Sequence, residues 1–410
     1  MKVAVLGCGV EGTSAARYFE SLGNEVTVFE KYSGDNLDDF DLVVRSPSNV
    51  PSKIKARKVS SGTIEFLDRC PAPIIGVTGT KGKGTTCSFI ASILRAADYT
   101  VHLVGNIGTP ALDELPNIKP NDIVVYEMSS FQLWDLQKSP STAVVLQIEP
   151  DHLDIHEDFS DYIAAKENIA SHQQAGDLVV YYAKNEISVK IAQMSLGKRL
   201  AYPSEKGARI SGNDLLFSEQ KICSIDAIKL PGVHNLENAL AAISAVWHLP
   251  KVTPQVIEKG LSSFSGLPHR LKFVREVGGV SYYDDSISTT EGSTIAAIKA
   301  FIQPKILILG GSSKGVEFSE LIPEIEQAEI RQMILLGEEA AKLEDLLVAA
   351  GLKNFVNLGQ DTTMTDVVRW AADSAEPGDV VMLSPACASL DMFKSYIDRG
   401  DQFIAAVEKL

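Results

Sequence analysis

The sequence predicts an α/β protein with mainly parallel sheets, divided into three blocks. Apolar runs of strand length alternate with amphipathic helical stretches along almost all of the 410 residues, a pattern typical of parallel sheets covered by helices. A chain of this length exceeds one ordinary hydrophobic core. Two segments rich in proline and glycine, 71–73 and 266–268, interrupt the pattern, because such residues break helices and strand ladders. We therefore place the domains at residues 1–72, 73–266 and 267–410.

The first block begins with a strand at Lys2–Leu6, and the chain then turns through Gly7, Gly9 and Gly12 into a helix. Further strands are expected at Glu25–Phe29 and 41–45, and Glu30 closes the second strand. This spacing fits the fingerprint of dinucleotide-binding domains. A nicotinamide-dependent oxidoreductase is therefore one interpretation. The block has room for only about half of a doubly wound dinucleotide domain, which favours a nucleotide diphosphate as the ligand.

The second block opens with the most informative segment of the chain, the loop at residues 79–85 between an apolar strand and a helix. Its three glycines let backbone N–H groups surround a polyphosphate, while Lys83 reaches the outer phosphates. The match to the standard phosphate-binding loop has two departures, since Val77 replaces its first glycine and Gly84 its hydroxyl residue. Thr85 can supply that hydroxyl to Mg²⁺ instead. The segment predicts binding of a nucleoside triphosphate.

Acidic and histidine side chains follow the next strands of this block, which we expect at 122–126, 142–148 and 177–182. Glu127 ends the first of them, and a segment rich in His, Asp and Glu, residues 149–156, follows the second. Carboxylates at strand ends near a phosphate-binding loop are typical Mg²⁺ ligands. Zinc is less expected, because no cysteine accompanies these residues. The alternative for each is an ordinary solvated loop.

A helix is expected at 235–247, with Asn235 and Asn238 on one face at its start, where the amides can read a base or cap the helix.

The third block has expected strands at Val280–Asp284, 305–309, 332–336 and Val380–Leu383. Polar loops follow three of these strands, and they should meet in one crevice at the carboxyl edge of the sheet. Lys314, in one of these loops, can hold a carboxylate.

Composition excludes several classes of protein. The net charge is −15, from 38 basic and 53 acidic residues, which disfavours nonspecific nucleic-acid binding and anionic membrane surfaces. Five scattered cysteines without a C-x-x-C pair fit a reducing compartment. No apolar run reaches the ~18 residues of a membrane helix, and the first residues lack the features of a signal peptide. We expect a cytoplasmic protein.

In this order, the motifs resemble those of the Mur ligases of bacterial peptidoglycan synthesis, in particular their D-glutamate-adding branch. The resemblance extends over the whole chain and includes Gly79–Thr85, Glu127-Met-Ser-Ser-Phe-Gln132, Asp151-His152-Leu-Asp154, Asn235-x-x-Asn238, Gly266–Arg270 and Ser384-Pro-Ala-Cys-Ala-Ser-Leu-Asp391. It implies a Rossmann-like UDP-binding domain, a central P-loop-type ATPase domain and a Rossmann-like amino-acid-binding domain. It also implies that ATP phosphorylates the carboxylate of UDP-MurNAc-L-Ala and that the amine of glutamate attacks the acyl phosphate.

The resemblance also implies site residues. For catalysis these are Lys83, His152, Lys166 and Arg270, and for ATP they are Gly79, Thr80, Lys81, Gly82, Lys83, Gly84, Thr85, Asn235, Asn238 and Asp285. Two Mg²⁺ ions would be held by Thr85, Glu127, His152 and Lys166, with Lys166 carbamylated. The substrates would contact Gly9, Val10, Glu11, Glu30, Asn106, Ser129, Thr289, Lys314, Ser389, Leu390 and Tyr396. We expect a monomer.

Two positions depart from the family pattern. Ile287 stands where the family commonly has a lysine that pairs with a substrate carboxylate, and Tyr396 stands where a phenylalanine usually contacts glutamate. Loss of an ion-paired hydrogen bond costs about 1.5–3 kcal/mol when nothing replaces it. The alternatives that stay open are a ligase adding L-glutamate to the same nucleotide and, in a different class, the nicotinamide-dependent oxidoreductase.

Overall fold

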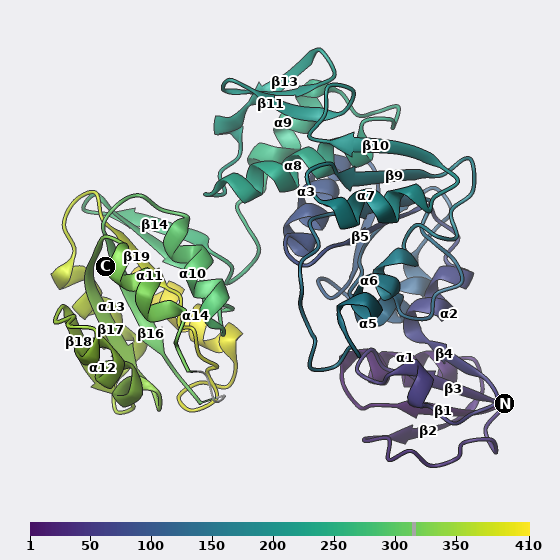
Figure 1. Ribbon diagram of the computed structural model, residues 1–410, viewed down its shortest axis with the longest axis horizontal. Coiled ribbons are helices and arrows are strands. Elements are labelled where there is room, and N and C mark those ends of the chain that lie inside the picture. The colour runs from purple at the N-terminus through teal and green to yellow at the C-terminus, as the bar shows by residue number, and fades with distance from the viewer. Residues whose placement is uncertain (314–316) are drawn as a thin grey trace. The chain divides into compact units, whose positions relative to one another are not determined.

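The computed structural model describes residues 1–313 and 317–410 (Figure 1). Its contacts divide the chain into two compact units, one made of residues 1–228 and 234–264 and the other of residues 229–233 and 265–410. The first unit contains two parallel sheets and a small antiparallel one, and the second unit contains one mixed sheet. The predicted α/β class with mainly parallel sheets is confirmed. Among the described residues, no helix has the length and apolarity needed to cross a membrane.

The N-terminal sheet has four parallel strands in the order β2-β1-β3-β4. The strand β1 is central, and its residues Val3 to Leu6 are completely buried. The elements are β1 (Lys2–Leu6), α1 (Val10–Ser21), β2 (Glu25–Phe29), β3 (Leu42–Arg45), β4 (Val59–Ser61) and α2 (Gly62–Arg69). The predicted strand at 41–45 therefore begins one residue later, and β4, which has only three residues, was not predicted.

The central sheet has six parallel strands in the order β10-β9-β8-β5-β7-β6. The strand β5 lies inside this sheet and all five of its residues are buried, which explains its unbroken apolar sequence. The elements are β5 (Ile74–Thr78), α3 (Lys83–Ala96), β6 (Val101–Gly105), α4 (Ala111–Glu114), β7 (Ile123–Glu127), α5 (Ser130–Leu133), β8 (Thr142–Val145), α6 (Phe159–Glu167), β9 (Leu178–Tyr182), α7 (Glu186–Gln193), β10 (Lys198–Tyr202), α8 (Val233–Val246) and α9 (Pro254–Ser263).

The strand β8 is shorter than the predicted strand at 142–148. After Val145, the backbone N–H of Leu146 still bonds to the carbonyl of Thr78, at 2.9 Å. The carbonyl of Gln147 then accepts a bond from the N–H of Thr80, also at 2.9 Å. These residues thus line the phosphate-binding loop, and the apolar run continues past the strand because Leu146 and Ile148 remain buried.

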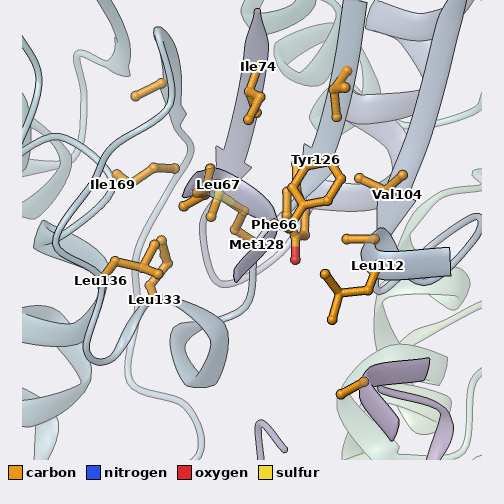
Figure 2. Packing of buried hydrophobic residues seen from close by; sticks show 14 of the residues in the cluster. Phe66, Leu67, Ile74, Val104, Leu112, Tyr126, Met128, Leu133, Leu136 and Ile169 are labelled. Carbon is orange, nitrogen blue, oxygen red and sulfur yellow. The ribbon is translucent and has the colours of Figure 1, made fainter. Parts of the chain in front are cut away.

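One hydrophobic core joins the N-terminal and central sheets. It includes Val3 and Val5 of β1 together with Tyr126 and Met128 at the end of β7. Figure 2 shows Phe66 of α2 beside Tyr126, and the rings of these two residues meet edge to face with centroids 5.5 Å apart. A second link is the buried Arg45 at the end of β3, whose Nε donates to Asp135 at 2.9 Å. The two sheets of this unit therefore share one interior.

An antiparallel sheet of three strands was missed in the sequence. It contains β11 (Ala208–Ser211), β12 (Asp214–Phe217) and β13 (Gln220–Ser224). The loop between β11 and β12 is Gly212-Asn213, with Gly212 at a φ of 59°. Such two-residue loops join antiparallel strands. The strands are short and carry several polar residues, so they lack the apolar runs by which the longer parallel strands were predicted.

The second unit contains a six-stranded sheet in the order β14-β15-β19-β16-β17-β18, in which only the edge strand β14 is antiparallel. The predicted strands Val280–Asp284 and Val380–Leu383 are confirmed. The elements are β14 (Lys272–Val277), β15 (Val280–Asp284), α10 (Glu291–Lys299), β16 (Lys305–Gly310), α11 (Leu321–Gln327), β17 (Ile330–Leu336), α12 (Ala340–Ala349), β18 (Phe355–Gly359), α13 (Met364–Ser374), β19 (Val380–Leu383) and α14 (Tyr396–Val407).

We predict that Gly260→Ala destabilises the first unit. A Cβ at Gly260 in α9 would lie 2.5 Å from the Cα of Ile93 in α3, so the two helices would have to separate. Overpacking of this kind costs about 1–3 kcal/mol. The free energy of unfolding in urea should fall by that amount. Gly62→Ala is the control, since its Cβ would meet nothing closer than 3.6 Å, and equal effects of both substitutions would contradict the prediction.

Candidate active site

The phosphate-binding loop lies between β5 and α3, as the sequence predicted. Gly79 and Gly82 have φ values of 157° and 83°, which side chains rarely allow. A Cβ at Gly79 would also lie 2.6 Å from the Cβ of Leu146. Gly82 is the residue before α3, which begins at Lys83. The first backbone N–H groups of a helix have no partner within the helix, so this end of α3 is suited to an anion.

Two lysine side chains share one backbone carbonyl of this loop. The Nζ of Lys83 donates to the carbonyl oxygens of Gly79 and Thr80, at 3.1 and 3.0 Å. The Nζ of Lys166, from α6, donates to the carbonyl of Gly79 at 3.0 Å and to the hydroxyl of Thr78 at 3.2 Å. Burial, with the nearby charge of Lys83, lowers the pKa of Lys166 well below its usual value. The Lys166 amine is thereby favoured in its neutral, nucleophilic form.

Thr80 ties the phosphate-binding loop to the predicted His- and Asp-rich segment. Its hydroxyl donates to the carbonyl of Glu149 at 3.0 Å and accepts from the Glu149 N–H at 2.9 Å. The same hydroxyl lies 3.1 Å from the hydroxyl of Tyr162 on α6. His152 follows in this segment with a φ of 55°, and its ring lies 5.0 Å from that of Phe131. The loop and the segment are thus held as one structure.

A cavity of about 270 Å³ lies beside this structure. It brings together five of the predicted site residues, namely Lys83, Asn106, Ser129, His152 and Lys166. Four further residues line it and were not predicted: Pro47, Ser130, Phe131 and Tyr162. Ser130 and Phe131 belong to the Ser-Ser-Phe motif that was noted in the sequence. Tyr162 lies four residues before Lys166, on the same face of α6.

The other predicted nucleotide and metal residues of this unit lie around the start of α3 or at a strand end. Thr85 is buried in the first turn of α3, and Glu127 is buried as the last residue of β7. Asn235 and Asn238 are buried on α8, and the Asn238 amide donates to the Asn235 side chain at 3.3 Å. The Thr86 hydroxyl donates to Asn238 at 3.4 Å, which links α8 to α3. Lys81 is exposed, and Gly84 is buried.

The residues predicted from the N-terminal glycine turn differ from one another in exposure and contacts. Gly9 precedes α1, while Val10 and Glu30 are exposed. Glu11 instead points toward the central sheet, where its carboxylate accepts a bond from the Gln132 amide at 3.2 Å. Burial raises the pKa of Glu11. Glu11 therefore connects α1 with the segment that carries Ser129, because Gln132 also completes the capping box of Ser129.

In the second unit, the loops after β15 and β19 meet, as the sequence predicted. The carboxylate of Asp285 accepts bonds from the Ser384 hydroxyl at 2.7 Å and from the Leu271 N–H at 2.9 Å. Thr289 is half-buried and Ser389 is buried, whereas Leu390 and Tyr396 are 71% and 36% exposed. Arg270 is exposed in this unit. Lys314 lies outside the described residues.

A buried arginine that sequence reasoning missed holds these loops together. Arg399 of α14 has no exposed surface. Its guanidinium donates to the carbonyl oxygens of Ser286, Cys387 and Ala388 and to the Ser286 hydroxyl, at 2.8 to 3.1 Å. Burial lowers the pKa of Arg399 to about 10, so the group stays charged at neutral pH. A single arginine on an amphipathic helix gave no signal in the sequence that separates it from a surface residue.

Comparison with known proteins agrees with these motifs along the whole chain. Residues 77–246 match the Mur ligase middle domain, and residues 269–387 match the Mur ligase glutamate ligase domain. The chain is 34% identical to a UDP-N-acetylmuramoylalanine–D-glutamate ligase of Clostridium tetani over an alignment 446 positions long, which covers 100% of the chain and 97% of the relative. A protein of the same name from Acetivibrio thermocellus is 36% identical, with 100% and 96% covered. The chain belongs to the Mur ligase family.

Solved structures of Mur ligases share the fold. UDP-N-acetylmuramate–alanine ligase of Thermotoga maritima aligns with a TM-score of 0.64 at 19% identity and covers 100% of this chain and 99% of its own. The MurF ligase of the same organism, solved with ADP, gives 0.59 at 18% identity and covers 90% and 88%. At these identities the likeness shows the fold alone. The three-domain α/β architecture expected from the sequence is that of the family.

As a Mur ligase, the chain is an ATP-dependent enzyme that forms an amide bond in peptidoglycan precursor synthesis. This decides against the nicotinamide-dependent oxidoreductase. Mur ligases use ATP and Mg²⁺, and the residues fit both, because the phosphate-binding loop presents Lys83 and the helix end while Thr85, Glu127 and His152 offer donors. Within the described residues, no group of three or more His, Cys, Asp or Glu side chains converges as a preformed metal centre. A complete Mg²⁺ site would therefore need hydroxyl, phosphate or modified-lysine oxygens as well.

We predict that Asp285→Asn changes how stability depends on pH. Burial raises the pKa of Asp285 from 3.8 to about 6. The native state therefore holds more protons than the unfolded state between these values, and stability falls as pH rises through this window. Asp285→Asn should remove that fall. The difference in unfolding free energy between about pH 4.5 and about pH 8 should shrink by roughly 1–3 kcal/mol.

The measurement is urea unfolding at both pH values. Asp373→Asn serves as the control, because Asp373 is an exposed aspartate of the same unit and its removal should leave the pH dependence unchanged. An unaltered pH dependence in Asp285→Asn would show that this carboxyl is ionised in the native state at much lower pH.

Proposed function

We propose that this Mur ligase joins D-glutamate to UDP-MurNAc-L-Ala. In the first step a carboxylate oxygen of the nucleotide substrate attacks the γ-phosphorus of ATP, and ADP leaves. In the second step the glutamate amine attacks the acyl phosphate, and phosphate leaves. The observation that carries this proposal is the cavity, which brings Lys83, Lys166 and His152 together with Asn106 and Ser129. The names of the full-length relatives support D-glutamate as the second substrate.

Phosphoryl transfer is mainly a problem of positioning and charge. In this proposal Lys83 and the first N–H groups of α3 hold the outer phosphates of ATP. The Lys83 ammonium bonds to two carbonyls of the loop, and charged phosphate oxygens are stronger acceptors than neutral carbonyls. Asn235 and Asn238 would contact the base, and Asp285 another part of ATP. Arg270 would support the charge that develops during transfer.

We propose that Mg²⁺ is held by Thr85, Glu127, His152 and a carbamylated Lys166, with two ions in all. When bound, Mg²⁺ supplies positive charge to the phosphate oxygens. The argument for carbamylation rests on the lysine itself. Lys166 is 1% exposed and bonds only to neutral acceptors among its described contacts. A neutral amine that adds CO₂ loses one proton and becomes a carboxylate-bearing carbamate, which is a hard oxygen ligand.

For the amino acid, we propose a site among the loops after β15, β16 and β19, with Thr289, Lys314, Ser389, Leu390 and Tyr396. Ile287 is half-buried in the first of these loops, and its N–H donates to the carbonyl of His269 at 3.0 Å. This position offers no cation to a glutamate carboxylate. The amino-acid preference must then come from the other residues, which makes the choice between D- and L-glutamate the most informative measurement.

For the nucleotide substrate, we propose contacts with Gly9, Val10, Glu11, Glu30, Asn106 and Ser129. Glu11 would also hold Gln132 and thereby the turn at Ser129. We further propose a monomer that works in the cytoplasm. The five cysteines are all free, which suits a reducing compartment.

We predict that ADP release requires both UDP-MurNAc-L-Ala and an amino acid, and that D-glutamate is preferred to L-glutamate and D-aspartate. The assay couples ADP formation to a spectroscopic readout with each amino acid in turn. Lys83→Ala is the matched control, and its turnover should fall by at least about 10³-fold while its melting temperature stays unchanged. Turnover without the nucleotide substrate would overturn the ligase proposal, and a preference for L-glutamate would overturn only the amino-acid assignment.

We predict that Lys166→Ala is inactive and regains part of its turnover in short-chain carboxylates such as acetate or propionate. The substitution leaves room for a free carboxylate where the carbamate would stand. Turnover is measured against carboxylate concentration. Lys305→Ala is the control, because Lys305 is also buried but lies at the start of β16 and outside the cavity. Its turnover should not respond to carboxylates. No rescue of Lys166→Ala, with ATP binding intact, would count against carbamylation.

A further inference from the structure

Ser130, His156 and Asp161 form a chain of hydrogen bonds that ends at the wall of the cavity. The Oγ of Ser130 lies 2.9 Å from the Nε2 of His156, and the Nδ1 of His156 lies 2.8 Å from the Oδ2 of Asp161. Ser130 lines the cavity together with Lys83, His152 and Lys166. The His156 side chain has no exposed surface. None of these three residues has a role in the function proposed above.

The carboxylate of Asp161 determines which atoms donate and which accept in this series of hydrogen bonds. Besides His156, it accepts bonds from the Trp134 indole at 3.1 Å and from the Glu157 N–H at 3.3 Å. Burial alone would raise the pKa of Asp161, but the bonds from His156 and Trp134 lower it. An ionised Asp161 can only accept, so the Nδ1 of His156 carries a proton, and in the neutral imidazole the Nε2 is then the acceptor. With the imidazole neutral, the Ser130 hydroxyl donates to Nε2 and keeps its lone pairs for another donor.

Aromatic rings fix the imidazole in this orientation. The Phe131 ring stacks on His156 with an interplanar angle of 10° and centroids 5.2 Å apart, and Trp134 lies at 4.3 Å. Tyr162 meets the imidazole edge to face at 5.2 Å. Among the described contacts of this ring, Asp161 is the one charged group. Asp161, His156 and Ser130 are thus arranged as in a general-base relay, in which a carboxylate orients a histidine and the histidine accepts a hydrogen bond from a hydroxyl.

Only the second step of the proposed ligation needs a proton to be moved. The nucleotide substrate already attacks ATP as a carboxylate. In the second step the attacking nitrogen must lose a proton when the amide forms, and the departing phosphate must gain one. A relay at the cavity wall that can first accept and then return a proton meets both needs.

We propose, resting on this ligation, that Ser130 takes the proton of the attacking amine and passes its own proton to His156. As the N–C bond forms, an N–H bond breaks and an O–H bond forms at Ser130 Oγ. The former hydroxyl proton moves to Nε2 of His156, and the imidazolium is stabilised by Asp161. When the C–O bond to phosphate breaks, the electron pair leaves with the phosphate, which takes the proton back through Ser130. Ser130 is then a catalytic residue, while His156 and Asp161 are positioning residues that act through it.

The test compares the two steps in the full chain. Exchange of radiolabelled ADP into ATP, with UDP-MurNAc-L-Ala and without glutamate, reports the first step, and the kcat for ligation with D-glutamate includes the second. Ser130→Ala should lower this kcat by about 10²- to 10⁴-fold and leave the exchange rate within about threefold. Ser130→Thr keeps a hydroxyl and should retain most of the activity. His156→Gln and Asp161→Asn should show the same split, with unchanged KM values.

His102→Gln is the matched control. Like His156, His102 is a poorly exposed histidine bonded to carboxylates, in its case Glu114 at 2.7 Å and Asp122 at 3.0 Å. It does not line the cavity. Its loss should lower stability without separating the two steps. Equal loss of both steps in Ser130→Ala, or ligation close to that of the parent chain, would overturn the relay. If Ser130→Ala does not fold, Asp161→Asn decides by the same criteria. A parent chain without any exchange would overturn the proposed function, and the relay with it.

Discussion

The carbonyl of Gly79 accepts hydrogen bonds from the amino groups of two lysines, and this shared oxygen brings both side chains to the cavity. Lys83 reaches it from the start of α3, and Lys166 reaches it from α6. Burial and the nearby charge of Lys83 both act against a charge on the Lys166 amine. Negative charge from phosphate oxygens, or from a modification of Lys166, would reduce this repulsion.

The second unit also contains a completely buried basic side chain, but it is an arginine. Arg399 is as completely buried as Lys166 and also bonds mainly to backbone carbonyls, yet its pKa stays near 10. A guanidinium holds its proton under conditions in which a lysine amine loses it. The arginine thus stays charged and holds the loops at Ser286 and at 387–388 together by hydrogen bonds. The lysine, by contrast, is placed where its charge can change.

Sequence reasoning suggested candidate site residues where neighbouring residues form a recognisable pattern, and their roles remain predictions. The phosphate-binding loop, the strand end at Glu127 and the pair Asn235 and Asn238 each carry their signal within a few residues. The relay of Ser130, His156 and Asp161 could not be predicted this way, because His156 lies 26 residues from Ser130 and an isolated histidine in a polar segment has many ordinary roles. Arg399 was missed for the same reason, since its acceptors come from loops more than ten residues away.

The same contrast applies to the fold. Strands such as β5 and β19 were predicted because burial on both faces requires apolar runs, whereas the short strands β11 to β13 are only partly buried and lack such runs. At Ile287 the backbone holds the loop in place, whereas the side chain decides which charge the loop offers. The N–H of Ile287 bonds to the carbonyl of His269, and the adjacent Ser286 is held by Arg399. Neither contact involves the Ile287 side chain. An isoleucine at this position offers no charge to an amino acid, so any cation for a glutamate carboxylate must come from neighbouring side chains.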